Sequence, residues 1–236
     1  MMKFTALLLA AYLLGSVPFG MLIAAAHGID LRKVGSGNIG ATNLSRALGR
    51  RWAYVCFVLD LAKGLLPTLA VGIWFDGIAG TNGLLAQLAV GCAAITGHVF
   101  PVYLRFKGGK GVATSFGVAL GLWPYYTICA AITLVIWVVF VLIWRYVSLA
   151  SLAAAFAFPV ILVAAIALIP GWRFSDLWPL LIVAMVIPVL VFVRHRDNIV
   201  RLLAGTESKV LQKSKEQACD SNPPPARPRP LAGKTG

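Results

Sequence analysis

The sequence predicts an all-α membrane protein, a polytopic bundle of transmembrane helices. Hydrophobic residues make up 59% of the chain and charged residues only 12%, and the mean hydropathy is +0.84. A soluble domain could not bury so many apolar side chains and still present a surface that water wets. Each span needs about 20 residues to cross a hydrocarbon core about 30 Å thick. The 236 residues therefore have room for about seven spans in one membrane domain.

The first apolar segment is expected to form a retained helix over residues 4–26. A signal peptide also begins with a basic residue such as Lys3 and continues with an apolar run. This run is longer than the apolar region of most signal peptides, and it carries GSVPFG at residues 15–20. The glycines and Pro18 of that stretch permit a kink and close packing against neighbouring helices.

The other spans follow from the charge-free segments of the chain. From Gly111 to Trp144 there is no formal charge, yet one helix of that length would measure about 51 Å, well beyond the hydrocarbon core. We therefore divide this stretch at GLWPYY, residues 121–126, as the tip of a helical hairpin. The remaining spans are expected at about 52–75, 83–104, 111–122, 125–144, 147–169 and 178–193.

The distribution of basic residues predicts the orientation in the membrane. With seven spans, one side receives residues 27–51, 105–110, 145 and the chain from 194 onward. That side then carries every Lys and Arg except Lys3, Lys63 and Arg173. Because cytoplasmic loops carry the excess of basic residues in membrane proteins, we expect the C-terminus in the cytoplasm and the N-terminus on the outer side.

The chain is expected to divide into a transmembrane domain, residues 1–207, and a basic tail, residues 208–236. The tail contains PPPARPRP and lacks the hydrophobic pattern that a folded domain needs. We expect it to be disordered and to rest near anionic lipid head groups. Membrane orientation accounts for the net charge of +13, and charge alone does not indicate a nucleic-acid partner.

The four cysteines predict neither a disulfide framework nor a metal site. Cys56, Cys92 and Cys129 lie in apolar runs and Cys219 lies in the tail, with no CxxC pair and no histidine-rich neighbourhood. Such cysteines are typically buried free thiols. No metal ion or cofactor is therefore expected.

Three polar clusters are predicted to face the same side of the membrane. The first cluster, residues 35–46, begins with GSGNIGATN and ends at Arg46. It offers the backbone of Gly37 and the side chains of Ser36, Asn38, Thr42 and Asn43. If Thr42 or Asn43 caps a helix that runs through Arg46, the start of that helix could hold a phosphate. A capped turn at the membrane interface, with no ligand, is the alternative.

The second cluster, residues 105–115, reads RFKGGKGVATS. Glycines let a backbone approach an anion closely, the lysines supply charge, and a following helix supplies its positive end. The cluster is not a Walker A loop, because the residue after Gly109 and Lys110 is a glycine where Ser or Thr is required. No downstream aspartate is placed to hold magnesium, so nucleotide hydrolysis is not expected. Basic anchoring with a flexible turn is the alternative.

The third cluster, residues 194–207, reads RHRDNIVRLLAGTE and follows the last span. At helical spacing His195, Asn198 and Leu202 share a face, with Arg194 and Arg201 close by. A histidine beside an amide and several arginines can move a proton or bind a phosphate. An ordinary basic helix beside the membrane is the alternative.

Asp60 and Lys63 are the charged residues expected inside a span. They lie three positions apart on one helix face, and each alone would be costly in hydrocarbon. We expect them to pair within the bundle, either as a structural element or as support beneath the site.

The three clusters together are similar to the signature motifs of a known family. GSGNIGATN, GHVFPVYLRFKGGKGVATS and HRDNIVRLLAGTE resemble those of the bacterial integral-membrane glycerol-3-phosphate acyltransferases that use acyl phosphate as donor. The resemblance covers about residues 5–210 and includes GSVPFG and DLAKGLLP. It implies an enzyme of the bacterial inner membrane with a periplasmic N-terminus and a cytoplasmic active site.

The resemblance also implies the reaction. A fatty acyl group would pass from acyl phosphate to the 1-hydroxyl of sn-glycerol 3-phosphate, giving lysophosphatidic acid and phosphate in an early step of phospholipid synthesis. The partners would be these two substrates and membrane lipids, with no cofactor; the oligomeric state stays open. Acyl phosphate is already activated, so the enzyme would mainly position the substrates and stabilise developing charge.

The resemblance implies roles for individual residues. The catalytic residues would be Ser36, Arg46, Lys107, His195 and Asn198. The substrate-binding residues would be Gly37, Asn38, Thr42, Asn43, Gly108, Gly109, Lys110, Gly111 and Glu207. Glycerol 3-phosphate is assigned to the catalytic residues other than Ser36, acyl phosphate to residues 108–111, and Glu207 to orienting a basic neighbour. Either His195 or a substrate phosphate could take the hydroxyl proton, and our hypothesis is that His195 chiefly positions substrate.

Two other functions fit these residues less well. Acyltransferases that use acyl-CoA or acyl carrier protein place an aspartate five positions after a histidine, and His27, His98 and His195 lack that neighbour. An anion transporter would need charged groups leading to the outer face. Beyond Asp60 and Lys63 that half of the bundle is almost uncharged, which disfavours transport.

Overall fold

The computed structural model describes residues 2–74 and 81–210, and these residues form helices and loops without a β-strand. The all-α prediction is confirmed. Residues 75–80 and 211–236, which include Cys219 and most of the predicted tail, lie outside the described residues. The helices are α1 (Met2–Ser16), α2 (Phe19–Ala26), α3 (Ala41–Leu48), α4 (Arg50–Trp74), α5 (Thr81–Val99), α6 (Val112–Gly121), α7 (Tyr125–Trp144), α8 (Val147–Leu168), α9 (Phe174–Arg194) and α10 (Arg196–Leu203), with 3-10 turns η1 (Leu31–Lys33) and η2 (Val102–Leu104).

The described residues contain five helices that are long and apolar enough to cross a membrane, namely α4, α5, α7, α8 and α9. The pair α1 and α2, bent by 41°, makes a sixth if it is one broken span. The seven predicted spans are not confirmed, because α6 has only 10 residues. Its boundaries nevertheless agree with the predicted hairpin: α6 ends at Gly121 and α7 begins at Tyr125.

The predicted kink in the first apolar segment is confirmed at residues 17–18, where α1 gives way to α2. Small residues bring this segment close to its neighbours. A Cβ on Gly15 would lie 2.2 Å from the carbonyl oxygen of Ala94 in α5, and a Cβ on Gly97 would lie 2.2 Å from that of Tyr12. Only glycine at both positions lets the backbones of α1 and α5 approach this closely.

Helix α6 packs against α4 in the same way. A Cβ on Gly117 would lie 2.1 Å from the carbonyl oxygen of Leu61, and one on Gly64 would lie 2.3 Å from that of Thr114. The hydroxyl of Thr114 also donates to the backbone oxygen of Asp60 at 2.9 Å. The short helix α6 is therefore held against α4 from its first turn onward, which fixes the loop that precedes it.

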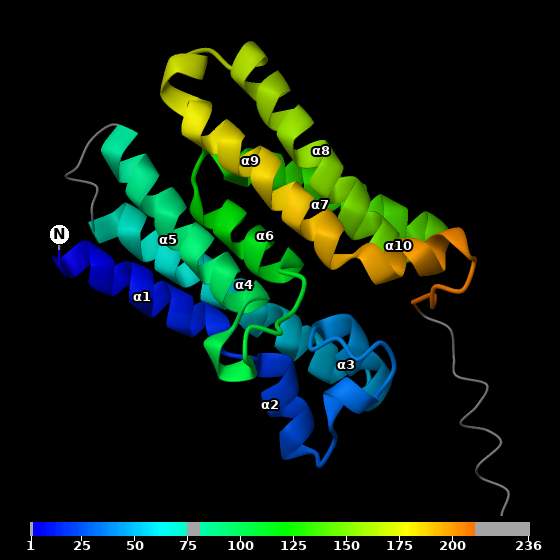
Figure 1. Cartoon of the computed structure of the whole chain (residues 1–236). Coiled ribbons are helices and arrows are strands. Elements are labelled where there is room, and N and C mark those ends of the chain that lie inside the picture. The colour runs from blue at the N-terminus through cyan, green and yellow to red at the C-terminus, as the bar shows by residue number, and fades with distance from the viewer. Residues whose placement is uncertain (1, 75–80, 211–236) are drawn as a thin grey trace, which may run out of the picture.

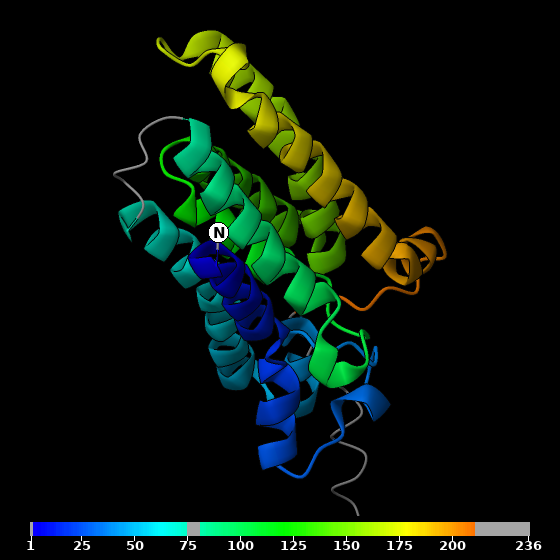
Figure 2. The same cartoon turned by 60° about the vertical axis from the view of Figure 1, so that its left-hand side comes forward.

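Helices α7, α8 and α9 form a second group beside α1, α4, α5 and α6 (Figures 1 and 2). Leu122, Tyr126, Leu162 and Leu180 belong to the buried core between the two groups. Phe156 on α8 is 67% exposed, as expected for a side chain on a face that meets lipid.

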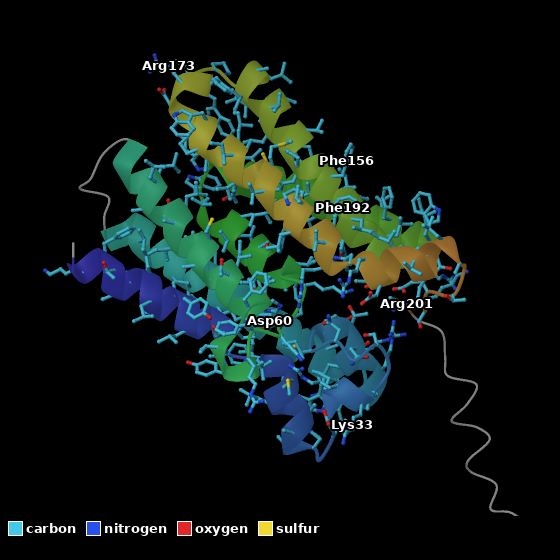
Figure 3. All side chains as sticks on the ribbon, viewed as in Figure 1. Lys33, Asp60, Phe156, Arg173, Phe192 and Arg201 are labelled. Carbon is cyan, nitrogen blue, oxygen red and sulfur yellow. The ribbon has the colours of Figure 1, made fainter. Side chains whose placement is uncertain are left out.

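The three polar clusters meet at one end of the bundle. Helix α3, the loop through η2 and helix α10 lie there together (Figure 1). Figure 3 places Lys33 and Arg201 at this end and Arg173 at the opposite end. The predicted gathering of the clusters on one side is therefore seen in the fold.

Candidate active site

The first cluster is a loop built around the side chain of Asn43. Its Nδ2 donates to the backbone oxygens of Leu31 and Val34, each at 3.0 Å, and Asn38, at 2.9 Å. Its Oδ1 accepts from the backbone N–H of Ser36 at 2.9 Å. The side chain is 1% exposed, so its polar groups are engaged within the loop. Asn43 therefore organises the first cluster, where the sequence predicted a substrate contact.

The predicted helix cap in this cluster is wrong. Helix α3 begins at Ala41 with Gly40 as its N-cap, so Thr42 and Asn43 lie inside its first turn. The Gly40 N–H is taken by Oδ1 of Asn38 at 2.9 Å. Asn38 and Asn43 instead hold the loop that leads into the helix.

The remaining predicted residues of the first cluster surround the loop. Ser36, Thr42 and Arg46 are exposed, so their side chains are open to a ligand. Gly37 has a positive φ of 67°, which favours glycine. Arg46 lies close enough to Lys110 of the second cluster for its charge to act on the lysine.

The glycine turn, residues 108–111 in the second cluster, folds back on the end of α5. The N–H of Gly108 donates to the oxygen of Val99 at 3.2 Å, and that of Gly109 donates to the oxygen of His98 at 3.1 Å. These two amides are therefore not free to donate to an anion, and the assignment of Gly108 and Gly109 to the acyl phosphate stays a prediction. A Cβ on Gly108 would lie 2.2 Å from the His98 oxygen. The glycines are thus needed for close packing against α5.

The other half of the turn keeps its donors available. Among the described residues, the amides of Lys110 and Gly111 have no hydrogen-bond acceptor. Gly111 has φ of 81° and is the N-cap of α6, so both amides lie where the helix dipole is positive. This half of the turn has the features of an anion site.

Two arginines hold the carbonyl side of the second cluster. Arg194 donates from Nη2 to the oxygen of Gly108 at 2.6 Å and from Nε to that of Gly109 at 3.1 Å. Arg32 donates from Nη2 to the oxygen of Lys107 at 2.9 Å. The Lys107 side chain itself is exposed. Arg194 thus links the third cluster to the second, and Arg32 links the second cluster to η1, just before the first cluster.

The second and third clusters join through a chain of polar side chains. Nζ of Lys110 donates to Oδ1 of Asn198, and Nδ2 of Asn198 donates to Oε1 of Glu207 at 2.6 Å. Glu207 also accepts from Ser148 at 2.9 Å and from Arg201 at 2.7 Å. The expectation that Glu207 orients a basic neighbour agrees with its ion pair to Arg201.

The protonation of this chain follows from its surroundings. Burial lowers the pKa of Lys110 to about 8; the charge of Glu207 opposes the shift, and those of Arg201 and Arg46 add to it. Burial alone would raise the pKa of Glu207, but hydrogen bonds from Arg201, Asn198 and Ser148 hold it below its usual value. Lys110 is therefore a cation at neutral pH that titrates within reach of physiological conditions, while Glu207 stays ionised.

His195 lies between α9 and α10 with 2% of its surface exposed. Its Nδ1 is 2.8 Å from the oxygen of Val191. Since a carbonyl can only accept, Nδ1 carries the proton and Nε2 keeps a lone pair. Burial lowers the pKa of His195 to about 4, and the charge of Lys110 adds to the shift. The imidazole is therefore neutral at pH 7 and can accept a hydrogen bond at Nε2.

The predicted pairing of Asp60 with Lys63 is confirmed. Nζ of Lys63 lies 2.7 Å from Oδ1 of Asp60 and donates to the oxygen of Val17, at the kink between α1 and α2, at 2.8 Å. Both side chains are buried. Figure 3 shows Asp60 between the bundle and the polar end.

With this geometry established, the comparisons with known proteins decide the family. The family model described as glycerol-3-phosphate acyltransferase matches residues 5–205. The chain belongs to the glycerol-3-phosphate acyltransferase family. It is 46% identical over 200 residues to a curated member from Trichlorobacter lovleyi, covering 84% of this chain and 93% of that protein. It is 42% identical over 209 residues to one from Aquifex aeolicus, covering 88% and 100%.

Solved structures agree with this assignment to the acyltransferase family. The crystal structure of PlsY (YgiH), an integral membrane glycerol 3-phosphate acyltransferase, in its glycerol 3-phosphate form superposes with a TM-score of 0.75. That pair is 41% identical and the match covers 88% of this chain and 96% of the other. The lysophosphatidic acid form of PlsY gives a TM-score of 0.72 at 39% identity.

Four residues that build the site in this family member were not among those predicted. Arg32 and Arg194 hold loop carbonyls, Ser148 supports Glu207, and His98 lies beneath Gly109. The sequence pattern places Arg194 in the third cluster, close to His195 and Asn198, without assigning it a role. The other three act through contacts between segments far apart in the sequence, and their positions carry no local signal.

Proposed function

We propose that this chain transfers a fatty acyl group from acyl phosphate to the 1-hydroxyl of sn-glycerol 3-phosphate, releasing lysophosphatidic acid and phosphate. The observation that carries the proposal is the convergence of three clusters on Lys110. Its ammonium contacts Asn198 of the third cluster and lies within reach of the Arg46 charge of the first. A site with this excess of positive charge at a membrane surface fits substrates that carry phosphate and a lipid chain.

Family membership supports the substrates. The solved relative was captured in a glycerol 3-phosphate form and in a lysophosphatidic acid form. These are the acceptor and the acylated product of the proposed reaction. An acyl phosphate donor carries an anhydride bond, and its cleavage releases inorganic phosphate. This donor is supported by a second candidate phosphate position in the site, at the amides of Lys110 and Gly111.

Glycerol 3-phosphate is assigned to Arg46, Lys107, His195 and Asn198. Arg46 and Lys107 are exposed cations that can meet the phosphate from water. The acyl phosphate head is assigned to the glycine turn, where the amides of Lys110 and Gly111 and the start of α6 attract an anion. Its acyl chain then extends toward the apolar faces of the helices, because the glycine turn leads directly into α6 of the bundle.

The chemical step joins the two positions. The 1-hydroxyl of glycerol 3-phosphate attacks the carbonyl carbon of acyl phosphate, the ester bond forms, and phosphate leaves with the electrons of the broken C–O bond. The hydroxyl proton passes to a phosphate oxygen, whose second pKa is about 6, because that oxygen is a stronger base than His195 with a pKa of about 4. His195 accepts a hydrogen bond from the hydroxyl at Nε2 and orients it.

The cytoplasmic location of the site is part of the proposal. Lys33 and Arg201 lie at the site end and Arg173 at the opposite end (Figure 3), and cytoplasmic loops of membrane proteins are enriched in basic residues. The curated relatives are bacterial, which supports the inner membrane of a bacterium. A reporter that folds only in the cytoplasm, fused after residue 210, would be inactive if the orientation were reversed.

The function is tested with purified protein in detergent, glycerol 3-phosphate and palmitoyl phosphate. Lysophosphatidic acid and released phosphate are followed together, and palmitoyl-CoA is assayed in parallel. We expect both products in equal amounts from palmitoyl phosphate and none from palmitoyl-CoA. A Lys110→Gln preparation, purified identically, excludes a contaminating enzyme. Turnover with palmitoyl-CoA alone would refute the donor, and a folded protein without turnover would favour anion transport.

A further inference from the structure

His98 is a buried histidine that the proposed reaction does not use. It lies in the last turn of α5 and is 6% exposed. A Cβ placed on Gly109 would lie 2.2 Å from its Nε2, so the imidazole edge presses directly against the Cα of Gly109. The backbone oxygen of His98 accepts the Gly109 N–H at 3.1 Å. Side chain and backbone of one residue thus support the same point of the glycine turn.

The other edge of the His98 ring faces Asp60. Nδ1 lies 3.6 Å from Oδ1 of Asp60, slightly beyond a hydrogen bond, and it is buried without a hydrogen-bond partner. The same carboxylate is held by Lys63 at 2.7 Å. A buried polar atom without a partner is rare and costs free energy. Packing alone therefore does not explain a histidine here, since an apolar side chain would fill the space without that cost.

We propose that His98 is a positioning residue for the acyl phosphate head. Its imidazole, which lies between Asp60 and Gly109, holds Gly109 in position and so orients the amides of Lys110 and Gly111. The inference rests on the proposed function, because it assigns the donor phosphate to those amides. The Asp60 and Lys63 pair then serves as a rigid base, fixed to the α1–α2 kink through Val17. His98 contacts the turn and not the substrate.

Two substitutions distinguish the contribution of Nε2, which faces Gly109, from that of Nδ1, which faces Asp60. The amide of Gln reaches the position of Nε2, so His98→Gln keeps a group beneath Gly109. The amide of Asn reaches only the position of Nδ1, so His98→Asn keeps a donor toward Asp60 and leaves space beneath the turn. We expect His98→Asn to raise the KM for palmitoyl phosphate about tenfold and to leave the KM for glycerol 3-phosphate within about twofold. His98→Gln should stay close to wild type.

His27→Asn is the matched control, because His27 is an exposed histidine outside the site and should leave both KM values unchanged. Equal effects of His98→Asn and His98→Gln would overturn the proposal. So would an equal rise in both KM values, which would show that the effect is not specific to palmitoyl phosphate, and so would no change in either variant.

A double-mutant cycle tests the contact itself. Gly109→Ala introduces a Cβ against His98, whereas His98→Ala removes the obstacle. We expect Gly109→Ala to lower the unfolding temperature in detergent and to raise the KM for palmitoyl phosphate, and we expect both losses to be smaller when Gly109→Ala is made in the His98→Ala protein. Additive effects would refute the steric contact.

The unfolding temperatures in this cycle can be measured whether or not the protein is catalytically active. If wild-type protein fails to acylate glycerol 3-phosphate, the proposed function fails, and the coupling in unfolding temperature still decides whether His98 supports the turn. If wild-type protein is active and the KM values of both substrates respond alike to His98→Asn, only the positioning role fails.

Discussion

The ammonium of Lys110 donates a hydrogen bond to the side-chain oxygen of Asn198, a residue 88 positions further along the chain. The opposite side of the same amide donates to Glu207 at 2.6 Å. The amide is therefore oriented at both ends, with its oxygen toward a cation and its nitrogen toward a carboxylate. Through this amide the ionised Glu207 is linked to Lys110.

Replacing Asn198 tests that arrangement. Asn198→Asp conserves the shape but turns the donor that faces Glu207 into an oxygen, so two carboxylates oppose each other. A hydrogen bond to a charged group is worth about 1.5–3 kcal/mol, and we expect kcat/KM to fall by a factor of about ten to a hundred. Steady-state kinetics with both substrates measure the loss. Arg196→Gln on the same helix, where the side chain is 81% exposed, should retain wild-type activity.

Arg194 makes a second specific prediction. Its guanidinium donates to two adjacent carbonyl oxygens, those of Gly108 and Gly109. A lysine ammonium at this position cannot reproduce the planar fork. We expect Arg194→Lys to raise the KM for palmitoyl phosphate about tenfold with little change in the KM for glycerol 3-phosphate. Arg196→Lys is the control, and an unchanged Arg194→Lys enzyme would show that the carbonyl contacts do not set the turn.

The helical architecture was predictable because hydrophobic runs indicate the membrane spans and charged segments indicate the loops between them. The hairpin at residues 121–126 and the kink near Pro18 followed from the length of charge-free segments and from local breakers. The short helix α6 was harder to place. Its apolar sequence resembles a span, but Gly117 and Gly121 serve to bury it against α4, and such packing has no signature in hydropathy.

The candidate site was predictable as a set of clusters and less so as a set of contacts. The motifs contain both residues that can face a ligand, such as Arg46, and residues that shape the loop, such as Asn43. Both kinds are polar, so their sequence pattern is the same. Only the three-dimensional structure shows that the Asn43 amide makes its hydrogen bonds inside the loop. It also shows that the N–H groups of Gly108 and Gly109 donate to backbone oxygens of α5.

The glycine contact between α6 and α4 predicts a loss of stability. Gly117→Ala places a Cβ 2.1 Å from the Leu61 oxygen, and such overpacking costs about 1–3 kcal/mol. Because α6 carries the glycine turn, activity should fall together with the unfolding temperature in detergent. Ala131→Val adds bulk on an exposed face of α7 and should change neither quantity. A Gly117→Ala protein as stable as wild type would mean that the helices can separate without cost.

The protonation of Lys110 predicts how activity depends on pH. With a pKa of about 8, the side chain is charged below that pH and becomes a neutral amine above it. We expect kcat/KM, which reports on the free enzyme, to decline as pH rises through about 8. Lys110→Arg keeps its charge over this range, so its activity, though reduced by altered geometry, should stay level. A wild-type profile that is flat to pH 9.5 would contradict a role for the Lys110 charge.

The same titration distinguishes positioning from base catalysis by His195. Its pKa of about 4 keeps the imidazole neutral across the measurable range, so a positioning role predicts no ionisation of His195 in the profile of kcat/KM between pH 6 and 7.5. His195→Gln should lower kcat by about a hundredfold and leave the shape of the profile unchanged, because the phosphate oxygen still receives the proton. A kinetic pKa near neutrality in the wild type that disappears in His195→Gln would instead identify His195 as the group that takes the hydroxyl proton.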